Sequence, residues 1–137
     1  MIYDFQTKNE SFIEMAYQLK QEGRKNWKFF LLLLDEDLVG VNPYDPNLSD
    51  AMKFKIQKEV INNYWYYIRE VIKIPEAGGY TTYRLNKLNL AISYCMSMNL
   101  NCFIEGPRQS GKTVGINIRY TWIDLVPSKS NLSRKSL

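Results

Sequence analysis

The chain has 137 residues, of which 45% are hydrophobic, enough for about one domain with a modest core. The formal net charge of +4 is a mild basic excess that many unrelated proteins share, so it excludes little. The absence of histidine removes the commonest general base and transition-metal ligand, and two cysteines without CxxC spacing argue against a zinc site. The N-terminus lacks signal-peptide features and the run Leu31–Leu34 is too short to cross a bilayer, so we expect a cytosolic protein without a membrane partner.

The first third of the chain combines one amphipathic segment with one apolar run. Helical spacing predicts a helix from Glu10 to Gly23, with Gly23 as its C-terminal stop. Its apolar face comprises Phe12, Met15, Ala16 and Leu19. Phe29–Leu34 is apolar throughout, so periodicity leaves open whether it is a strand or a helix. The prolines of Val41–Asn47 predict a turn-rich connector.

A second helix is predicted from a cap at Ser49 or Asp50 to about Ile72. Apolar residues recur at helical spacing along it, at Met52, Ile56, Val60, Tyr64, Tyr67 or Ile68, and Val71. The aromatic run around Trp65 could suggest base stacking, but its position on an apolar-periodic helix favours a place in the core.

Loops and short elements are predicted for the rest of the chain. Pro75–Gly79 is expected to be a loop. A third helix is expected over Arg84–Met98, with a buried face of Leu88, Ala91, Ile92, Cys95 and Met96. A short strand at Cys102–Glu105 and a helix from Thr113 to about Asp124 follow. We assign residues 1–125 to the N-terminal part of a P-loop ATPase domain and residues 126–137 to a disordered basic, serine-rich tail.

Gly106–Thr113 reads Gly-Pro-Arg-Gln-Ser-Gly-Lys-Thr and matches the phosphate-binding P-loop. Gly106 and Gly111 permit a tight turn whose backbone N–H groups cradle phosphates, at the positive end of the following helix. Lys112 would contact the β- and γ-phosphates, and the Thr113 hydroxyl would coordinate Mg²⁺. The strand before and helix after the motif favour this interpretation over a chance match in a turn. The cofactors would be ATP and Mg²⁺, and the binding residues Gly106, Pro107, Arg108, Gln109, Ser110, Gly111, Lys112 and Thr113.

Three other polar features have two interpretations each. Arg108 either reaches the γ-phosphate as an arginine finger does, or is a surface arginine or the partner of Glu105. Amides within Arg84–Asn89 either read the adenine edge or, as we slightly favour, cap a helix at Asn86 or are merely exposed polar residues. Four cations either contact DNA phosphates or form a solvated surface, the simpler interpretation; they are Lys20, Arg24, Lys25 and Lys28.

Between Asn62 and Trp122 the chain resembles the large terminase subunit of tailed bacteriophages, the ATP-driven motor that packs DNA into procapsids. The likeness is carried by Asn63–Val71 leading to Ile74-Pro75, by Tyr83–Ala91 and by Pro107–Thr113, and is weaker over Phe30–Asn62. The resemblance implies an ATPase with Lys112 and Arg108 as catalytic residues and Mg²⁺ at Thr113.

The same resemblance implies several partners and a location. The partners would be ATP, double-stranded DNA, the portal and the small terminase subunit, in the cytoplasm of the infected bacterial host. The family's adenine-contacting segment would fall near Arg84–Asn89, where the usual glutamine is not evident.

The residues after Thr113 lack the Walker B aspartate, the catalytic glutamate and the nuclease acidic triad of that family. We therefore expect an N-terminal fragment of a terminase large subunit that is inactive alone and whose remainder, from a truncated or split gene, would be a further partner. The alternatives are a fragment of a phage helicase or other nucleic-acid-translocating P-loop ATPase, and a non-catalytic nucleotide-binding remnant. The expected fold class is α/β, with a mostly helical N-terminal segment leading into the first strand–P-loop–helix unit of an incomplete P-loop NTPase sheet.

Overall fold

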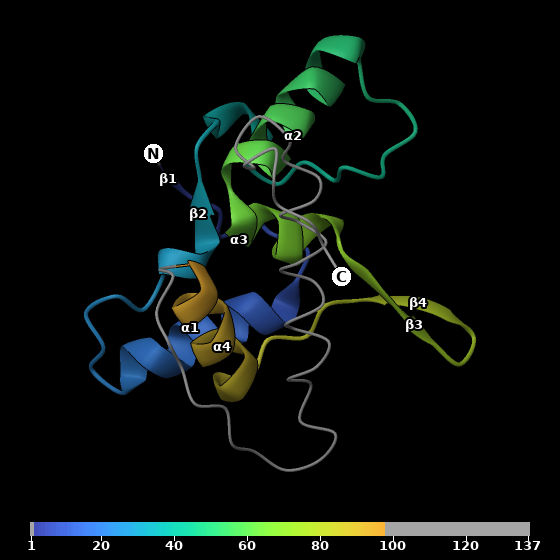
Figure 1. Cartoon of the computed structure of the whole chain (residues 1–137). Helices are drawn as coiled ribbons and strands as arrows, with labels where there is room; N and C mark the ends of the chain where they lie inside the picture. Colours follow the sequence, from blue (N-terminus) through green and yellow to red (C-terminus); the bar gives the residue numbers. More distant parts are fainter. Residues whose placement is uncertain (1, 98–137) are drawn as a thin grey trace, which may run out of the picture. The chain divides into compact units, whose positions relative to one another are not determined.

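The computed structural model describes residues 2–97 of the chain, which divides after Arg84 into two compact units, Met1–Arg84 and Leu85–Leu137. Over the described range, helices alternate with short strands paired in two-stranded antiparallel sheets (Figure 1). This confirms the expected mixture of helix and strand. The strand, P-loop and helix expected over Cys102–Asp124 lie outside the described residues, as does the tail at 126–137.

The first unit contains, in chain order, β1 (Ile2–Tyr3), α1 (Glu10–Gln21), the 3₁₀ turn η1 (Phe29–Leu31), β2 (Leu32–Leu33), the 3₁₀ turn η2 (Glu36–Leu38), α2 (Asp50–Asn62), α3 (Tyr64–Tyr66), the π-helical turn η3 (Tyr67–Val71), β3 (Lys73–Glu76) and β4 (Gly79–Thr82). The described part of the second unit contains α4 (Lys87–Ser97).

Helix α1 ends as its sequence predicts. Gly23 adopts a positive φ of 78°, which a residue without Cβ reaches at little cost. The Arg24 N–H donates to the Leu19 carbonyl at 3.0 Å and the Gly23 N–H to the Lys20 carbonyl at 3.0 Å, the paired bonds of a Schellman motif. The predicted buried face is confirmed at Phe12, Met15 and Ala16, and Leu19 is partly buried.

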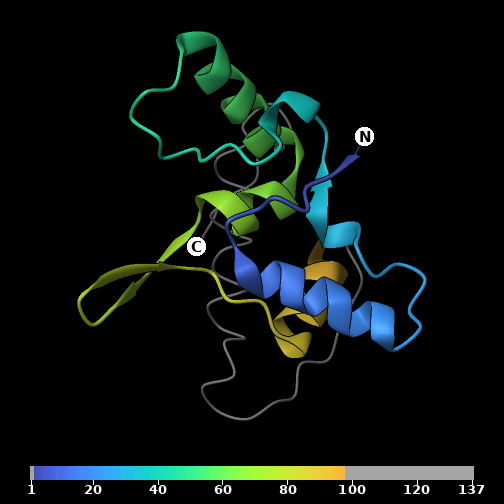
Figure 2. The ribbon, with the colours of Figure 1, turned by 180° about the vertical axis from the view of Figure 1, so that it is seen from behind.

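The apolar run Phe29–Leu34 divides into two conformations. Its first three residues form η1, and Leu32–Leu33 forms β2, which pairs antiparallel with β1 through Ile2 opposite Leu33. The rear view in Figure 2 shows β1 alongside β2. Burial follows the run, with Phe30, Leu31 and Leu33 all at 0% exposure. Leu34, at the end of the run, is 43% exposed. A continuous apolar run has neither helical nor alternating periodicity, which is why the sequence left its conformation open.

The second predicted helix is correct at its start and wrong at its end. Ser49 Oγ accepts from the Met52 N–H at 3.1 Å, so the predicted cap is confirmed. The helix stops at Asn62, because Asn63 is extended at φ −138° and ψ 96°. The Asn63 side chain starts a new helical turn by accepting from the Tyr66 N–H at 3.3 Å. The chain therefore continues to Val71 as the separate pieces α3 and η3.

Aromatic rings join α1, η1 and α3 in the core. Phe12 packs edge-to-face on Phe30 at 6.0 Å between centroids, and Phe29 packs edge-to-face on Trp65 at 5.3 Å. The tyrosines of the aromatic run are buried, as the core interpretation predicted: Tyr64, Tyr66 and Tyr67. Beside them lies an apolar cluster of Leu33, Leu38, Ile56 and Tyr66.

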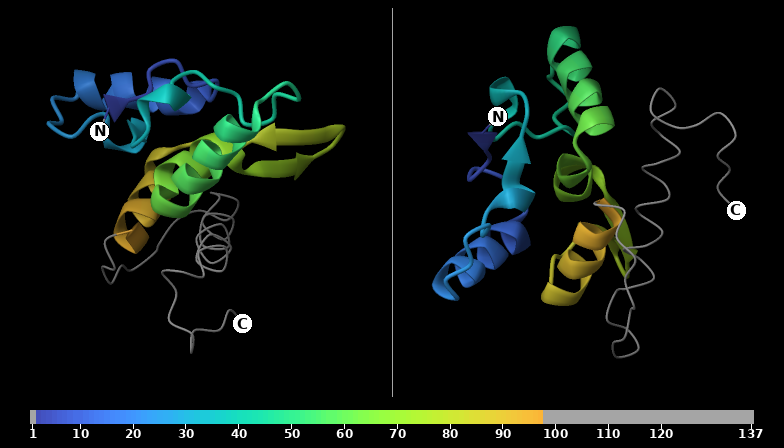
Figure 3. Two further views of the ribbon diagram at one scale, coloured as in Figure 1. Left: turned by 90° about the horizontal axis from the view of Figure 1, so that it is seen from above. Right: turned by 60° about the vertical axis from the view of Figure 1, so that its left-hand side comes forward.

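The loop expected at Pro75–Gly79 is instead part of a β-hairpin, so that prediction is wrong. Strands β3 and β4 pair from Lys73 opposite Thr82 to Glu76 opposite Gly79, and the hairpin extends outward in the left view of Figure 3. Gly78 and Gly79 make the tight reversal possible with φ of 92° and 139°. Both strands of a two-stranded sheet are edges, which is where Pro75 is tolerated.

Helix α4 begins at Lys87, three residues later than predicted. Ile92 is buried as expected and Leu88 and Cys95 are partly buried, but Ala91 is exposed, so its assignment to the buried face is wrong. The buried side of α4 instead includes Asn89, Leu90, Ile92 and Ser93. Asn89 and Ser93 are polar, so hydrophobicity alone does not predict that they are buried. The predicted end at Met98 and the side chain of Met96 lie outside the described residues.

Candidate functional site

The predicted nucleotide-binding residues all lie outside the part of the chain that the structure describes: Gly106, Pro107, Arg108, Gln109, Ser110, Gly111, Lys112 and Thr113. The same holds for Glu105, the possible partner of Arg108. Within residues 2–97, four arrangements of polar groups have defined geometry. They are the cap of α4, a buried ion pair, a buried carboxylate on α2, and a polar pocket at the start of α1.

The cap of α4 is made by two asparagines that bond reciprocally. The Asn89 N–H donates to Asn86 Oδ1 at 2.9 Å, and the Asn86 N–H donates to Asn89 Oδ1 at 2.7 Å. The Asn86 carbonyl also accepts from the Leu90 N–H at 2.9 Å, the first intrahelical bond. This is the geometry of a capping box with amides in both positions. The two amide oxygens proposed for an adenine edge are thus engaged by the backbone, which favours the capping interpretation.

The buried ion pair joins neighbouring residues in η3. Arg69 Nε lies 3.3 Å from Glu70 Oε1, and the two side chains are 0% and 6% exposed. Arg69 Nη1 donates to the Phe30 carbonyl at 2.8 Å and Nη2 to the Leu32 carbonyl at 3.2 Å. The Thr7 hydroxyl donates to the same Glu70 oxygen that Arg69 contacts. The guanidinium of Arg69 therefore links η3 to the segment Phe29–Leu33, which contains η1 and β2.

Burial shifts both members of this pair toward their neutral forms. Desolvation raises the pKa of the Glu70 carboxyl, and the Thr7 hydrogen bond and the Arg69 charge oppose the shift. Desolvation likewise lowers the pKa of the Arg69 guanidinium, against the charges of Glu70 and Asp4. An arginine titrates so far above neutrality that Arg69 stays charged.

Asn9 extends the buried polar network to the hairpin side of the unit. Its Nδ2 donates to the Arg69 carbonyl at 3.1 Å and to the Tyr83 carbonyl at 2.9 Å. Its Oδ1 accepts from the Ser11 hydroxyl at 2.7 Å. Asn9 is 2% exposed and its amide is bonded to three groups of the first unit, so it links η3, the end of the hairpin and the start of α1.

A second buried carboxylate, Glu59 on α2, was also missed from the sequence. It is 3% exposed and accepts from the Leu34 N–H at 2.9 Å, the Asp35 N–H at 3.0 Å and Asn63 Nδ2 at 2.7 Å. Its signal in the sequence is weak: Glu59 and Asn63 lie four residues apart on the predicted apolar face, as a polar pair that can meet on one side of a helix.

A polar pocket of about 160 Å³ opens at the start of α1. It is lined by Lys8, Asn9, Glu10, Ser11, Thr81, Thr82 and Arg84. Two cations, one carboxylate and three hydroxyls suit a small polar solute or ordered water.

Neither a metal-binding cluster nor a membrane-spanning helix is found within residues 2–97. Within that range no group of three or more His, Cys, Asp or Glu side chains is arranged to hold a metal ion. Cys95 is partly buried in α4. None of the described helices has the length and apolar character needed to span a membrane.

Comparison with protein-family models, with curated proteins and with solved structures finds no match for this chain.

Proposed function

We propose that the chain is the ATP-binding part of a tailed-bacteriophage terminase large subunit, the motor that moves double-stranded DNA into procapsids. In this proposal Gly106–Thr113 wraps the triphosphate, Lys112 contacts its β- and γ-phosphates, and Thr113 holds Mg²⁺. Arg108 stabilises the charge that develops on the γ-phosphate.

One observation carries the proposal, the sequence Gly-Pro-Arg-Gln-Ser-Gly-Lys-Thr at Gly106–Thr113. The spacing of its glycines, lysine and threonine meets the three needs of a phosphate site: converging N–H groups, a mobile cation and a hydroxyl for Mg²⁺. The resemblance of Asn63–Val71 and Tyr83–Ala91 to terminases narrows the class from P-loop proteins in general.

The proposal also assigns the groups that hold Mg²⁺ and excludes two groups from adenine recognition. In this proposal, Thr113 and the ATP phosphates hold the Mg²⁺. Since the oxygens of Asn86 and Asn89 cap α4, adenine recognition is assigned to other groups.

The test is a titration of the full chain with ATP, with and without Mg²⁺, by calorimetry. We expect saturable binding that weakens at least about tenfold in Lys112→Ala, because a charge-assisted phosphate contact is lost. Thr113→Val should abolish the benefit of Mg²⁺ and leave the Mg²⁺-free affinity unchanged. The matched control is Lys53→Ala, which removes an exposed lysine from α2.

Hydrolysis is measured in the same preparations. We expect no turnover above the Lys112→Ala background, because Asp124 is the single acidic residue after Thr113 in this sequence. Equal ATP affinity in the wild type and Lys112→Ala would contradict the proposed site. Robust turnover that requires Lys112 would keep the site and contradict the expectation that the chain is inactive alone.

A further inference from the structure

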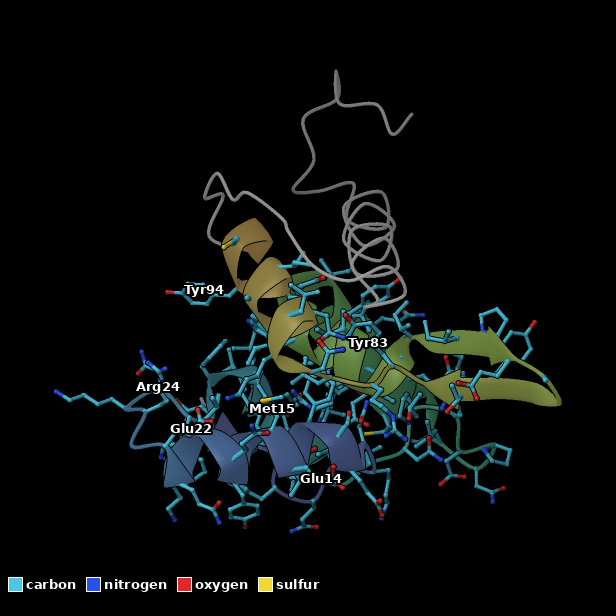
Figure 4. All side chains as sticks on the ribbon, turned by 90° about the horizontal axis from the view of Figure 1, so that it is seen from below. Glu14, Met15, Glu22, Arg24, Tyr83 and Tyr94 are labelled. Carbon is cyan, nitrogen blue, oxygen red and sulfur yellow. The ribbon has the colours of Figure 1, made fainter. Side chains whose placement is uncertain are left out.

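The segment Lys20–Lys28 concentrates positive charge within residues 2–97, which as a whole are balanced. Four of its nine residues are Lys or Arg and one is Glu, whereas residues 2–97 as a whole contain twelve cations and twelve carboxylates. The segment runs from the last turn of α1 into the connector that leads to η1. Figure 4 shows Arg24 just beyond the end of α1, and Lys20, Arg24 and Lys25 are all exposed.

Two aromatic rings contact these cations, and a third ring packs beside them. Lys20 Nζ lies 4.9 Å from the centroid of Trp27, and Lys28 Nζ lies 5.5 Å from the same ring. Lys28 Nζ is also 4.6 Å from the ring of Tyr3 in β1. Phe5, which is 41% exposed, lies 5.9 Å from Trp27 between ring centroids. We call these five residues, Tyr3, Phe5, Lys20, Trp27 and Lys28, the Trp27 patch.

Among the described residues, aromatic rings and not carboxylates hold the two lysines of the patch. The ion pairs within residues 2–97 are Lys55 with Asp37 and Arg69 with Glu70, so neither patch lysine is paired with a carboxylate there. A cation–π contact positions an ammonium without neutralising it. The negative end of the α1 macrodipole accounts for Lys20, which lies in the last turn, but not for Lys28, which lies well beyond it.

We propose that the Trp27 patch binds single-stranded nucleic acid. Lys20 and Lys28 contact successive phosphates, and the exposed ring of Phe5, with Trp27 beside it, offers a surface on which a base stacks. Binding to the phosphates of a duplex would use only the two lysines. The additional aromatic surface fits a single strand, because its bases have free faces whereas those of a duplex are stacked on one another. The same combination of cations and rings is the usual platform for single strands.

This inference does not depend on the proposed function. The patch and Gly106–Thr113 share no residue, so ATP binding and strand binding can succeed or fail separately. It also revises the simpler interpretation of Lys20 and Lys28 as solvated surface charges, since both ammonium groups are held against rings.

The test uses the full chain and a fluorescein-labelled 20-nucleotide oligothymidylate, followed by anisotropy over a range of salt concentrations. Lys20→Gln/Lys28→Gln should bind at least about tenfold more weakly at low salt and reduce the salt slope by about 0.7 per lysine lost. Phe5→Ala should weaken binding about fivefold or more and leave the salt slope unchanged, because it removes stacking rather than a phosphate contact.

Two controls separate the patch from charge in general and from loss of folding. Lys53→Gln/Lys58→Gln removes the same charge from exposed positions on α2 and should bind within about twofold of the wild type. Lys20→Arg/Lys28→Arg keeps the charge and should retain binding. Equal loss in both glutamine variants, or tighter binding to a 20-base-pair duplex or to polyglutamate than to the single strand, would overturn the proposal.

Discussion

Asn63 Nδ2 lies 2.7 Å from Oε2 of Glu59, one helical turn earlier, at the place where α2 gives way to α3. The same Nδ2 donates to the Leu32 carbonyl at 2.9 Å. Asn63 is therefore bonded both to α2, through Glu59, and to β2. Glu59 also accepts from the backbone N–H groups of Leu34 and Asp35. Glu59 and Asn63 together therefore attach the end of α2 to the segment that begins with β2. The helix is interrupted where these bonds are made.

Replacing the Glu59 carboxylate should therefore destabilise the first unit strongly. Glu59→Gln keeps the size of the side chain but turns an NH₂ group toward N–H donors. We expect a loss of about 2–4 kcal/mol in the free energy of unfolding, since buried donors are left without an acceptor. Urea denaturation followed by circular dichroism measures it. The matched change Glu14→Gln, at an exposed position of α1, should cost no more than about 0.5 kcal/mol. Similar effects of the two changes would contradict the assignment.

Removing the Tyr66 hydroxyl should not destabilise the first unit, in contrast to the replacement of Glu59. Its hydroxyl is fully buried beside Leu33, Leu38 and Ile56, and among the residues that the structure describes it has no hydrogen-bond partner. Burial raises the pKa of this phenol, as expected for a group removed from water. Tyr66→Phe should leave stability unchanged or raise it by up to about 1 kcal/mol, because a desolvated polar group is removed. Tyr80→Phe, at a 75% exposed position, is the control. A loss above about 1 kcal/mol in Tyr66→Phe would indicate a missed partner.

Glu70 should make stability depend on pH. Burial raises the pKa of its carboxyl in the folded state, so the folded chain binds this proton more tightly than the unfolded chain does. The contribution of Glu70 is fully present below the unfolded pKa of about 4.3 and is lost as pH rises through the folded pKa. The stability of the wild type relative to Glu70→Gln should therefore increase as pH is lowered from about 7 toward 4.

This dependence is measured by urea denaturation of both chains at several pH values. At neutral pH the wild type should have its smallest advantage over Glu70→Gln, because the folded state then carries the cost of burying the Glu70 charge. Glu14→Gln should show no comparable change with pH relative to the wild type. A difference between wild type and Glu70→Gln that grows with rising pH would contradict the raised pKa.

The cap of α4 separates two roles for the same asparagine. Asn86→Ala removes the oxygen that accepts from the Asn89 N–H and should cost about 1 kcal/mol of helix stability. Asn86→Asp restores a capping acceptor and should recover most of that loss. If Asn86 acts as a cap, ATP affinity measured by calorimetry should be the same in all three chains. Weaker ATP binding in Asn86→Ala and Asn86→Asp at unchanged helicity would instead support contact with adenine.

Features that depend on neighbours in the chain were predictable from the sequence. The Ser49 cap needs a hydroxyl three residues before a free N–H, and the stop at Gly23 needs a residue that tolerates positive φ. The buried face of α1 follows from helical spacing alone. The P-loop motif at Gly106–Thr113 belongs to the same class, since its chemistry is written in eight consecutive residues; it stays a prediction, because those residues lie outside the described range.

Features that depend on distant partners were not predictable. Glu59 bonds to backbone groups 24 and 25 residues away, and Thr7 bonds to Glu70 across 63 residues. The pairing of Lys73–Glu76 with Gly79–Thr82 was missed because Pro75 and the two glycines read as a loop.

The sequence by itself determined the Ser49 cap, the stop at Gly23 and the burial of the tyrosines around Trp65, because these features depend on residues that are neighbours in the chain. Only the tertiary structure decided that the second helix breaks at Asn63, that Arg69 and Glu70 are buried as a pair, and that Lys20 and Lys28 meet at Trp27. The physical reason is that local rules act through bonds between neighbouring residues. A buried polar group is satisfied by whichever donor or acceptor the folded chain brings to it.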